Sequence, residues 1–415
     1  MGVRPLAALA LALGGAYLSP IPSMRPSFLV FFLVVFAAYF AINTYLFIRG
    51  WQVLSVFARW RWLYAAIFWF LALAFVAGRN LENIAFTPWS TGLIWIGAFW
   101  FAFMYYLFLG TLVLDFGGRF LRHKRWLPRA WLVRWGRTKF VAAVSLLSVV
   151  AVVVSWGHWN ARNPKIVRTE VSLPQMGGAP RQLRVAVASD LHLGTLVSQE
   201  RAWGWVEMIN SLEPDIVILP GDIIDEDLPP VVEQDLGTAL RGLRAPLGVY
   251  AVTGNHEYIG GVADAVDYLE DHGVTVLRDR AEPVAGGALW LVGREDVSIS
   301  RFSGRPRMEL AEVMQRIPKG APVVVVDHQP VAPGEAVAAG AHLQLSGHTH
   351  DGQLWPNKYI LKAMHGFSSG IGLFEGMPLV VSPGLGTWGP PVRVGNRPEI
   401  LDLTLKFDRP EPEIF

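Results

Sequence analysis

The sequence contains no cysteine among its 415 residues. Disulfides and thiolate metal sites are therefore excluded, and any metal ion must be held by oxygen and imidazole ligands. The lack of cysteine suits a reducing and an oxidising compartment equally well.

Charge is also scarce, because charged residues make up 17% of the chain whereas hydrophobic residues make up 52%. Ordinary soluble domains carry about a quarter charged residues. The averages hide a split, since residues 1–160 are rich in Phe, Trp, Leu and Ala and poor in acids, while residues 165–415 have a globular composition. The net charge of +2 indicates little about partners, because the basic residues are concentrated in particular loops.

Four apolar stretches are long enough, or nearly so, to cross a bilayer core of about 30 Å, which takes about 20 helical residues. They cover residues 27–48, 62–78, 91–114 and 140–156. A fifth, residues 5–18, is shorter and is a span, a signal-like segment or an interfacial piece. We predict an all-α transmembrane region of four or five helices over residues 1–159.

Basic residues mark alternate loops between these stretches. Loop 49–61 holds three arginines and no acid, and loop 115–139 holds eight Arg and Lys residues against the single acid Asp115. Segments 20–26 and 79–90 hold one basic residue each. The positive-inside rule places the two basic loops in the cytoplasm, so the region after the last span is predicted to lie outside it.

The second basic loop also interleaves Trp126, Trp131 and Trp135 with Arg129 and Arg134. This mixture suits a helix on an anionic leaflet, and packing against the bundle explains it equally well. Next to a span, the membrane explains the pattern better than a nucleic acid does. We therefore expect membrane lipids as partners and no nucleic acid.

The rest of the chain alternates strand-like and helix-like stretches. Residues 160–182 form a linker with a first strand at 166–173, and the domain proper is predicted over 183–415. Its short, continuous apolar runs are typical of strands buried on both faces. Helix-like stretches at 199–212, 261–272 and 306–317 separate them, which predicts an α/β fold with functional residues where strands meet loops.

Five of these apolar runs end in a polar cluster. The clusters are Asp190-Leu-His192, Gly221-Asp222-Ile-Ile-Asp225, Gly254-Asn255-His256-Glu257, Asp327-His328 and Gly347-His348-Thr349-His350. A single His at a strand end is usually structural, but five of the ten histidines fall at these ends. Carboxylate, amide and imidazole groups suit Mn, Fe, Zn or Mg, so the clusters predict a metal site.

Hydrolysis of a phosphoester explains such a site. Two divalent ions about 3.5–4 Å apart would lower the pKa of water, so that hydroxide attacks, and would stabilise charge on the phosphoryl oxygens. Asp222, at a strand end, is the natural candidate to bridge both ions. The leaving oxygen needs a proton, which His256 beside Asn255 could supply while Asp225 holds its imidazole in the right tautomer.

The five clusters resemble the signature of the calcineurin-like metallophosphoesterase superfamily, which reads D-x-H, G-D-x-x-D, G-N-H-[DE], a separate His and G-H-x-H in that order. The resemblance implies a two-sheet sandwich flanked by helices, with the site at one edge. It implies one metal held by Asp190, His192, Asp222 and His350 and a second held by Asp222, Asn255, His328 and His348. It further implies that His256 is the leaving-group acid and Asp225 its partner.

The spans, the N-A-R-N-P linker, S-D-L-H-L-G, S-G-H-T-H-D-G-Q and S-P-G-L-G-T-W-G-P-P-V-R are similar to a bacterial membrane-associated branch of this superfamily. That branch includes phosphodiesterases and lipid-precursor pyrophosphatases. We thus expect an integral protein of a bacterial inner or cell membrane, with an extracytoplasmic domain that cleaves a phosphodiester, pyrophosphate or phosphomonoester of a lipid or envelope substrate. The alternatives are a phosphodiesterase for soluble nucleotides that uses the helices only as an anchor, and a non-catalytic membrane protein with a metal-binding module.

Three residues are weaker candidates for substrate contact. Arg393 could clamp a phosphate, and Trp388 could line an apolar pocket for a lipid tail. His365 lies in a loop rich in Gly and Phe that could cover the site, although a solvated loop histidine is the plainer interpretation. Glu257 is expected to support its own loop, and Asp327 either orients a ligand imidazole or simply ends a strand.

Overall fold

The structure is a computed structural model that describes residues 26–175 and 180–409. The described residues fall into two compact units, one within Met1–Trp159 and Gly389–Val392 and the other within Asn160–Trp388 and Arg393–Phe415. The possible fifth span at residues 5–18 lies outside the described residues.

The first unit is helical. Its elements are α2 (Pro26–Val53), η1 (Leu54–Trp60), α3 (Arg61–Glu82), α4 (Pro88–His123), α5 (Arg129–Val133) and α6 (Trp135–Ala161). Four stretches are long and apolar enough to cross a membrane, namely Leu33–Val53, Arg61–Glu82, Pro88–His123 and Trp135–Ala161. Each of these stretches contains most of one predicted span, so the prediction of four apolar helices is confirmed. The helices extend several residues beyond the apolar stretches seen in the sequence.

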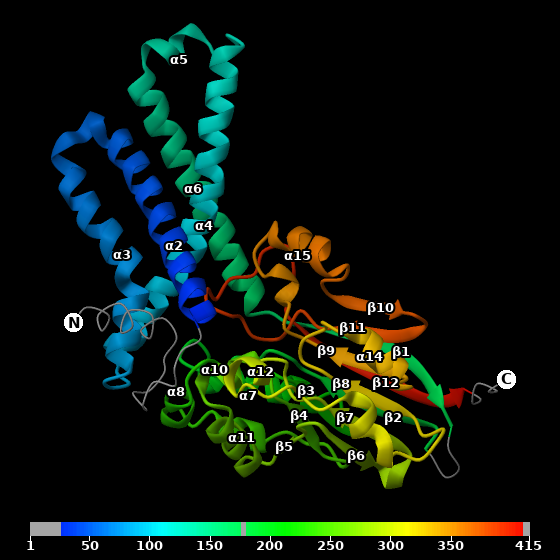
Figure 1. The fold of residues 1–415 in the computed structure, drawn as a ribbon. Coiled ribbons are helices and arrows are strands. Elements are labelled where there is room, and N and C mark those ends of the chain that lie inside the picture. The colour runs from blue at the N-terminus through cyan, green and yellow to red at the C-terminus, as the bar shows by residue number, and fades with distance from the viewer. Residues whose placement is uncertain (1–25, 176–179, 410–415) are drawn as a thin grey trace. The chain divides into compact units, whose positions relative to one another are not determined.

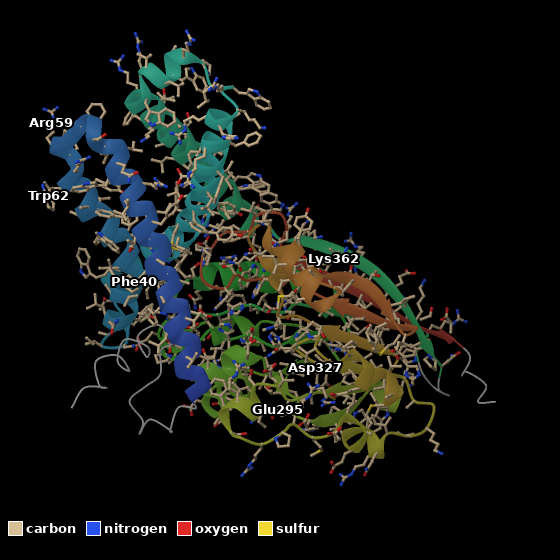
Figure 2. The ribbon with its side chains drawn as sticks, turned by 45° about the horizontal axis from the view of Figure 1, so that its top comes forward. Phe40, Arg59, Trp62, Glu295, Asp327 and Lys362 are labelled. Carbon is tan, nitrogen blue, oxygen red and sulfur yellow. The ribbon has the colours of Figure 1, made fainter. Side chains whose placement is uncertain are left out.

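This unit carries apolar side chains on its outside and a few polar ones inside. Phe40 and Trp62, which Figure 2 labels, are 39% and 78% exposed. Asn43 is fully buried, accepts a hydrogen bond from Trp100 Nε1 at 3.0 Å and donates to the carbonyl of Tyr39 at 2.9 Å. Exposed apolar side chains and a buried, hydrogen-bonded Asn43 fit the requirements of a helical bundle in lipid.

The second unit contains two mixed sheets (Figure 1). The first has the order β1 (Lys165–Pro174), β12 (Glu399–Arg409), β2 (Gln182–Val187), β3 (Ile216–Pro220), β4 (Val249–Val252) and β5 (Thr275–Val276). The second has the order β10 (Gly370–Phe374), β11 (Met377–Val381), β9 (Leu343–Ser346), β8 (Val323–Val326), β7 (Leu289–Gly293) and β6 (Arg280–Val284). Strands β2 to β5 are mutually parallel, as are β7, β8, β9 and β11.

Helices connect these strands. They are α7 (Gln199–Asn210), α8 (Pro229–Glu233), α9 (Gly237–Arg241), α10 (Asn255–Gly260), α11 (Val262–Asp271), η2 (Ala285–Gly287), α12 (Ile299–Phe302), α13 (Leu310–Val313), η3 (Met314–Arg316), α14 (Pro333–Ala338), η4 (His350–Gly352) and α15 (Asn357–His365). The predicted helices at 199–212 and 261–272 correspond to α7 and α11. The one predicted at 306–317 is two short turns, α13 and η3.

Three apolar layers hold this unit together. Val185 of β2, Ile218 of β3 and Leu291 of β7 belong to a buried cluster between the sheets. A second cluster joins the other face of the first sheet to α7 and α11, and a third joins the other face of the second sheet to α13 and α14. Strands with apolar residues on both faces therefore make a helix–sheet–sheet–helix sandwich, which confirms the predicted α/β fold.

The parallel strands bring the predicted ligands to one edge of the sandwich, because the carboxyl ends of parallel strands lie on the same side. Asp190, Asp222, Asn255, His328 and His348 each come two or three residues after the end of β2, β3, β4, β8 and β9, respectively.

Candidate metal centre

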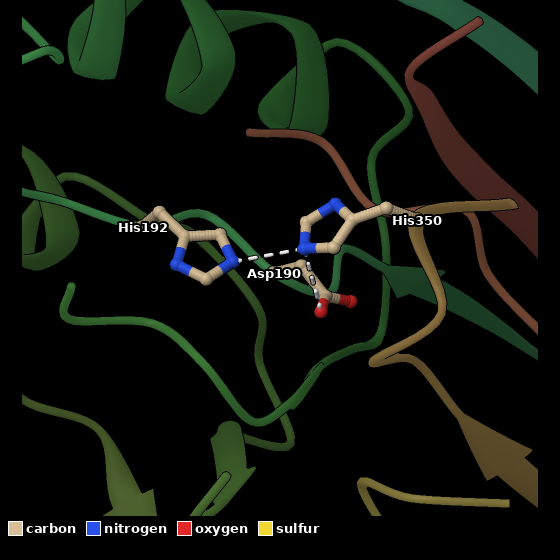
Figure 3. A group of neighbouring side chains, drawn as sticks. All are labelled: Asp190, His192 and His350. Atoms are coloured by element: carbon tan, nitrogen blue, oxygen red, sulfur yellow. Dashed lines mark hydrogen bonds and ion pairs between the residues drawn. The ribbon is translucent and has the colours of Figure 1, made fainter. Parts of the chain in front are cut away.

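The first group of predicted ligands consists of Asp190, His192 and His350, all buried. One ligand atom from each lies within 4.8 Å of the others. Nε2 of His192 is 3.0 Å from Nε2 of His350, which is 3.6 Å from Oδ1 of Asp190 (Figure 3). Two ring nitrogens that face each other beside a carboxylate converge on one position, and this geometry fits a divalent cation.

The second group consists of Asp222, His328 and His348, whose ligand atoms meet the same 4.8 Å limit. Nε2 of His328 lies 3.1 Å from Oδ2 of Asp222 and 3.3 Å from Oδ1 of Asn255. Nδ1 of His328 is 2.7 Å from the Pro220 carbonyl oxygen, which can only accept a hydrogen bond, so this nitrogen carries the proton. The carboxylate of Asp222 favours a second proton on Nε2, so binding of a metal ion at Nε2 would displace that proton and leave Nδ1–H on the carbonyl, the arrangement that metal-binding histidines use.

Asp222 links the two groups. It belongs to the second group and also forms a third with His192 and His256. Its Oδ1 accepts a hydrogen bond from the backbone N–H of His256 at 2.9 Å, while its Oδ2 faces His328. Asp222 is therefore placed where one carboxylate could bind metal ions in both ligand groups.

The ligand loops have an unusual backbone. Asp190, His192, Asp222, His348 and His350 have φ values of 54°, 49°, 50°, 71° and 48°, respectively, in the left-handed region that non-glycine residues rarely adopt. Each such residue costs about 1–3 kcal/mol and persists only where its surroundings hold it in place. These loops are held by backbone hydrogen bonds, such as those from Asp190 N to the Gly221 carbonyl at 3.1 Å and from His192 N to the Asp222 carbonyl at 3.0 Å.

Two motif glycines allow the loops to approach each other. Gly221 has φ of 83°, and a Cβ there would lie 2.7 Å from Nδ1 of His328. A Cβ at Gly254 would lie 2.1 Å from Oδ1 of Asp222. Side chains at either position would displace a predicted ligand.

Glu257 stabilises the same loops through hydrogen bonds to their backbone. Its buried carboxylate accepts hydrogen bonds from the backbone N–H groups of Asp222, Ile223, Ile224 and Gly254 at 2.7–3.2 Å. The expectation that Glu257 supports its loop is confirmed.

Asp225 contacts two imidazoles. Its Oδ1 lies 3.2 Å from Nδ1 of His256 and 3.3 Å from Nδ1 of His192. Both contacts are within ion-pair distance, but neither has the geometry of a hydrogen bond. Burial would lower the pKa of His256, but the negative charges of Asp222 and Asp225 outweigh it and raise that pKa to about 10. Burial would likewise raise the pKa of Asp225, and its contacts with the two histidines hold it below the ordinary value instead. Sequence reasoning missed the contact with His192, for which the motif spacing contains no signal.

The three candidates for substrate contact have different settings. Trp388 is 55% exposed, and its ring lies edge-on to that of His256 with 5.9 Å between centroids. Arg393 is fully buried, which differs from the phosphate clamp expected from the sequence. His365 is the last residue of α15, and its side chain lies outside the part that the structure describes.

The guanidinium of Arg393 lies behind a ligand. It donates to the carbonyls of Gly384 and Gly386 and to Oδ1 of Asn396, and its Nη2 is 3.1 Å from Nδ1 of His350. Because a guanidinium only donates, this contact requires an unprotonated Nδ1, and the single proton of the neutral ring then lies on Nε2. Nε2 must therefore lose this proton, or the contact with Arg393 must change, when a metal ion binds at Nε2. Burial and the positive charges of His192 and Arg393 hold the pKa of His350 well below its ordinary value, in agreement with a neutral ring.

Asp327 and Glu295, labelled in Figure 2, follow β8 and β7 and belong to ion-pair networks. Asp327 pairs with Nη1 of Arg307 at 2.8 Å, and burial raises its pKa to about 6. Glu295 accepts hydrogen bonds from Thr253, Tyr258 and Arg278. Of the two interpretations of Asp327, the contacts favour a strand end held by an arginine.

The residues match a known family. A family model described as calcineurin-like phosphoesterase matches residues 183–352. The chain is also 33% identical over 231 residues to a metallophosphoesterase of Aquifex aeolicus, an alignment that covers 54% of this chain and 85% of that protein. The chain belongs to the calcineurin-like metallophosphoesterase family. The ligand groups described above fit the divalent metal ions that the family implies.

Two further relatives of the chain have sequences that bear on its helices. It is 32% identical over 279 residues to a bovine transmembrane protein with metallophosphoesterase domain, covering 64% of this chain and 62% of that one. It is 27% identical over 385 residues to a Campylobacter jejuni metallophosphoesterase, covering 91% of this chain and 99% of that one. The chain thus spans less than two thirds of the bovine relative's length. The four apolar helices and the transmembrane relative together support membrane integration.

Proposed function

We propose that this chain is a membrane-anchored, two-metal phosphoesterase that hydrolyses a phosphodiester, pyrophosphate or phosphomonoester bond in a lipid or cell-envelope substrate. The observation that carries the proposal is an exposed aromatic side chain, Trp388, directly beside the buried His256 in a chain with four membrane-length helices. A site with a proton donor and an apolar rim suits a substrate with a phosphate and a hydrocarbon part.

The ligands are proposed to form two sets that share Asp222. The first comprises Asp190, His192, Asp222 and His350, and the second comprises Asp222, Asn255, His328 and His348. When bound, divalent ions supply Lewis acidity, which lowers the pKa of water and offsets charge on the phosphoryl group. The contacts of Asp222 with members of both groups support its role as the shared ligand.

His256 is proposed to give its proton to the leaving oxygen. Its Nδ1 is directed to Asp225, which leaves Nε2 to face the substrate. The negative charges of Asp222 and Asp225 raise the pKa of His256, which favours a ring that carries a proton to donate. Asp225 is then a positioning residue for both His256 and the ligand His192.

Arg393 is proposed as a positioning residue as well. Its guanidinium is anchored on two backbone carbonyls and holds the ring of His350 from the side away from the other ligands. The usual partner of a metal-binding histidine accepts a hydrogen bond from its second ring nitrogen. Arg393 donates instead, so its proposed role is to hold the ring in place rather than to fix a metal-binding tautomer.

We further propose that residues 1–159 anchor the protein, 160–182 are the linker, and 183–415 form the catalytic domain. The basic loops 49–61 and 115–139 support a catalytic domain outside the cytoplasm of a bacterial inner or cell membrane. This orientation gives the site access to envelope lipids.

An activity comparison tests the substrate class. The full chain with Mn²⁺ is assayed on a phospholipid diester in mixed micelles and on soluble nucleotide diesters. We expect hydrolysis of the lipid, with a rate that falls when the lipid is diluted by detergent at constant bulk concentration. Hydrolysis of nucleotides with a higher kcat/KM than the lipid would favour the anchor-only alternative, and Asp222→Asn is the inactive control in both assays.

A further inference from the structure

Exposed apolar side chains are concentrated in one stretch of the sequence among the described residues of the second unit. Of the eleven large apolar side chains exposed within residues 160–409, eight lie between residues 331 and 388. Soluble surfaces rarely concentrate apolar groups in this way unless they bind something.

Helix α15 carries three of these, Tyr359, Ile360 and Met364, while the most exposed, Leu373, lies on β10. Ile360 and Met364 are 58% and 68% exposed and lie one helical turn apart, while Lys358 and Lys362 lie together on another side of the helix. Figure 2 shows Lys362 on this helix. Residues 355–374 contain these two lysines and no acidic residue. An amphipathic helix flanked by lysines and aromatic residues is typical of segments that lie on an anionic membrane surface.

A groove of about 460 Å³ adjoins α15. Its walls come from the start of α14, the end of α15, and strands β10 and β11, and they contain only apolar residues and glycine. The lining residues are Pro330, Val331, Ala332, Pro333, Gly334, Met364, Phe367, Phe374 and Leu379. The side chains that line the groove are apolar and could contact hydrocarbon, while backbone polar atoms are also exposed in its walls.

Two of the segments that line the groove are connected to loops that carry predicted metal ligands. Pro330 is two residues after His328, so their Cα atoms are at most about 7.6 Å apart. On the other wall, Ser368 follows Phe367, and its carbonyl accepts a hydrogen bond at 2.6 Å from Oγ1 of Thr349, which lies between His348 and His350. Whatever fills the groove is therefore mechanically linked to the metal-ligand loops.

We propose that this α15 surface, comprising Tyr359, Ile360 and Met364 with the adjoining groove, binds the bilayer in which the helices are inserted, and that the groove holds a lipid acyl chain. The membrane helices confine the domain next to a bilayer, so lipid is the apolar partner present at the highest local concentration. Tyr359 and Trp355 are exposed aromatic residues of the type enriched at membrane interfaces. The inference does not depend on which ester the site cleaves.

The lack of cysteine allows a site-specific test. Single-cysteine variants Met364→Cys and Ile360→Cys of the full chain are labelled with an environment-sensitive fluorophore. Met308→Cys is the matched control, because Met308 is also exposed, at 44%, and lies far from α15 in sequence. Each protein is reconstituted without substrate into vesicles of phosphatidylcholine and phosphatidylglycerol, with or without a nitroxide on the acyl chains.

We expect the acyl nitroxide to reduce the fluorescence at positions 364 and 360 at least about twofold, and to leave position 308 nearly unchanged, because only the first two labels would lie at the depth of the acyl chains. Equal quenching at all three positions would overturn the proposal. Quenching at 364 that rises with protein density in the membrane would also overturn it, because it would indicate a second copy as the occupant.

A charge substitution provides the complementary test. Ile360→Asp in the Met364→Cys background should bring quenching at 364 down to the level of the Met308 control, whereas Val232→Asp, at an exposed apolar residue of α8, should not change it. Melting curves of the two variants show whether both remain folded. Lys362→Glu should reduce quenching in vesicles with phosphatidylglycerol more than in pure phosphatidylcholine. Unchanged quenching in both Ile360→Asp and Lys362→Glu would contradict the proposal, and it would do so whether or not the site hydrolyses lipids.

Discussion

Oδ1 of Asp225 lies 3.2 Å from Nδ1 of His256, and the same oxygen is 3.3 Å from Nδ1 of His192. One carboxylate thus orients both the proposed proton donor and a proposed metal ligand. Loss of the carboxylate and loss of the proton donor should therefore have different consequences.

We predict that His256→Asn lowers kcat about 10²–10⁴-fold for diesters with a poor alkoxide leaving group and much less for nitrophenyl diesters, which leave without a proton. Metal content should stay at the wild-type level. Asp225→Asn should lower both kcat and metal content, because His192 also loses its partner. Equal losses of kcat by His256→Asn on both substrates would rule out the proton-donor role.

Arg393→Lys should weaken metal binding about 10–100-fold, because an ammonium cannot contact His350 and the two backbone carbonyls in the same way. The effect is measured by titrating metal into stripped protein. Arg294→Lys is the matched control, since Arg294 is also 1% exposed and pairs with Asp279 and Glu335 away from the predicted ligands. Wild-type metal affinity in Arg393→Lys would show that this arginine has no positioning role.

Asp402 should contribute stability that depends on pH. Arg184 donates to both of its carboxylate oxygens at 2.9 Å, and these hydrogen bonds hold the pKa of Asp402 below its ordinary value. The stabilisation is fully present above about pH 3.9, the pKa of an aspartate in the unfolded chain. It is lost as the pH falls through the lower pKa that Asp402 has in the folded protein.

Asp402→Asn should therefore lower the free energy of unfolding by about 1.5–3 kcal/mol near neutral pH. The difference should shrink below about pH 4, as measured by denaturant unfolding. Glu170→Gln, in an exposed pair with Lys406, should change little at any pH. A difference for Asp402→Asn that is independent of pH would contradict this account.

The proposed orientation is tested by labelling from one side of the membrane. In cells with a permeabilised outer barrier, a membrane-impermeant thiol reagent should modify Met308→Cys and should not modify Arg125→Cys, in the second basic loop, until the inner membrane is opened. Both residues are exposed in the structure. The reverse pattern would place the catalytic domain in the cytoplasm.

Much of the fold and the convergence of the candidate site could be read from the sequence. Runs such as IVILP and VVVV are apolar at every position because both faces of β3 and β8 are buried, so strand ends were easy to locate. The residues after those ends converge because the strands are parallel. The helix at 306–317 was overestimated, since its residues form two short turns against the second sheet.

The remainder depends on contacts between segments far apart in sequence. The sequence offered Arg393 only as a weak candidate for phosphate contact. Its burial behind His350 depends on the carbonyls of Gly384 and Gly386, which no local pattern reveals. The left-handed backbone of Asp190 likewise depends on a hydrogen bond to Gly221 in another loop. The groove beside α15 combines residues from two strands and two helices, so the spacing of apolar residues could not indicate it.

The central claim is that one site holds two divalent ions through the shared ligand Asp222. The most direct test is the metal content of the full chain, loaded with Mn²⁺ and freed of unbound ions, measured by mass spectrometry together with hydrolysis of a chromogenic diester. The account predicts two ions per wild-type chain, and fewer than one together with loss of activity in Asp222→Asn. Wild-type metal content and activity in Asp222→Asn would contradict it.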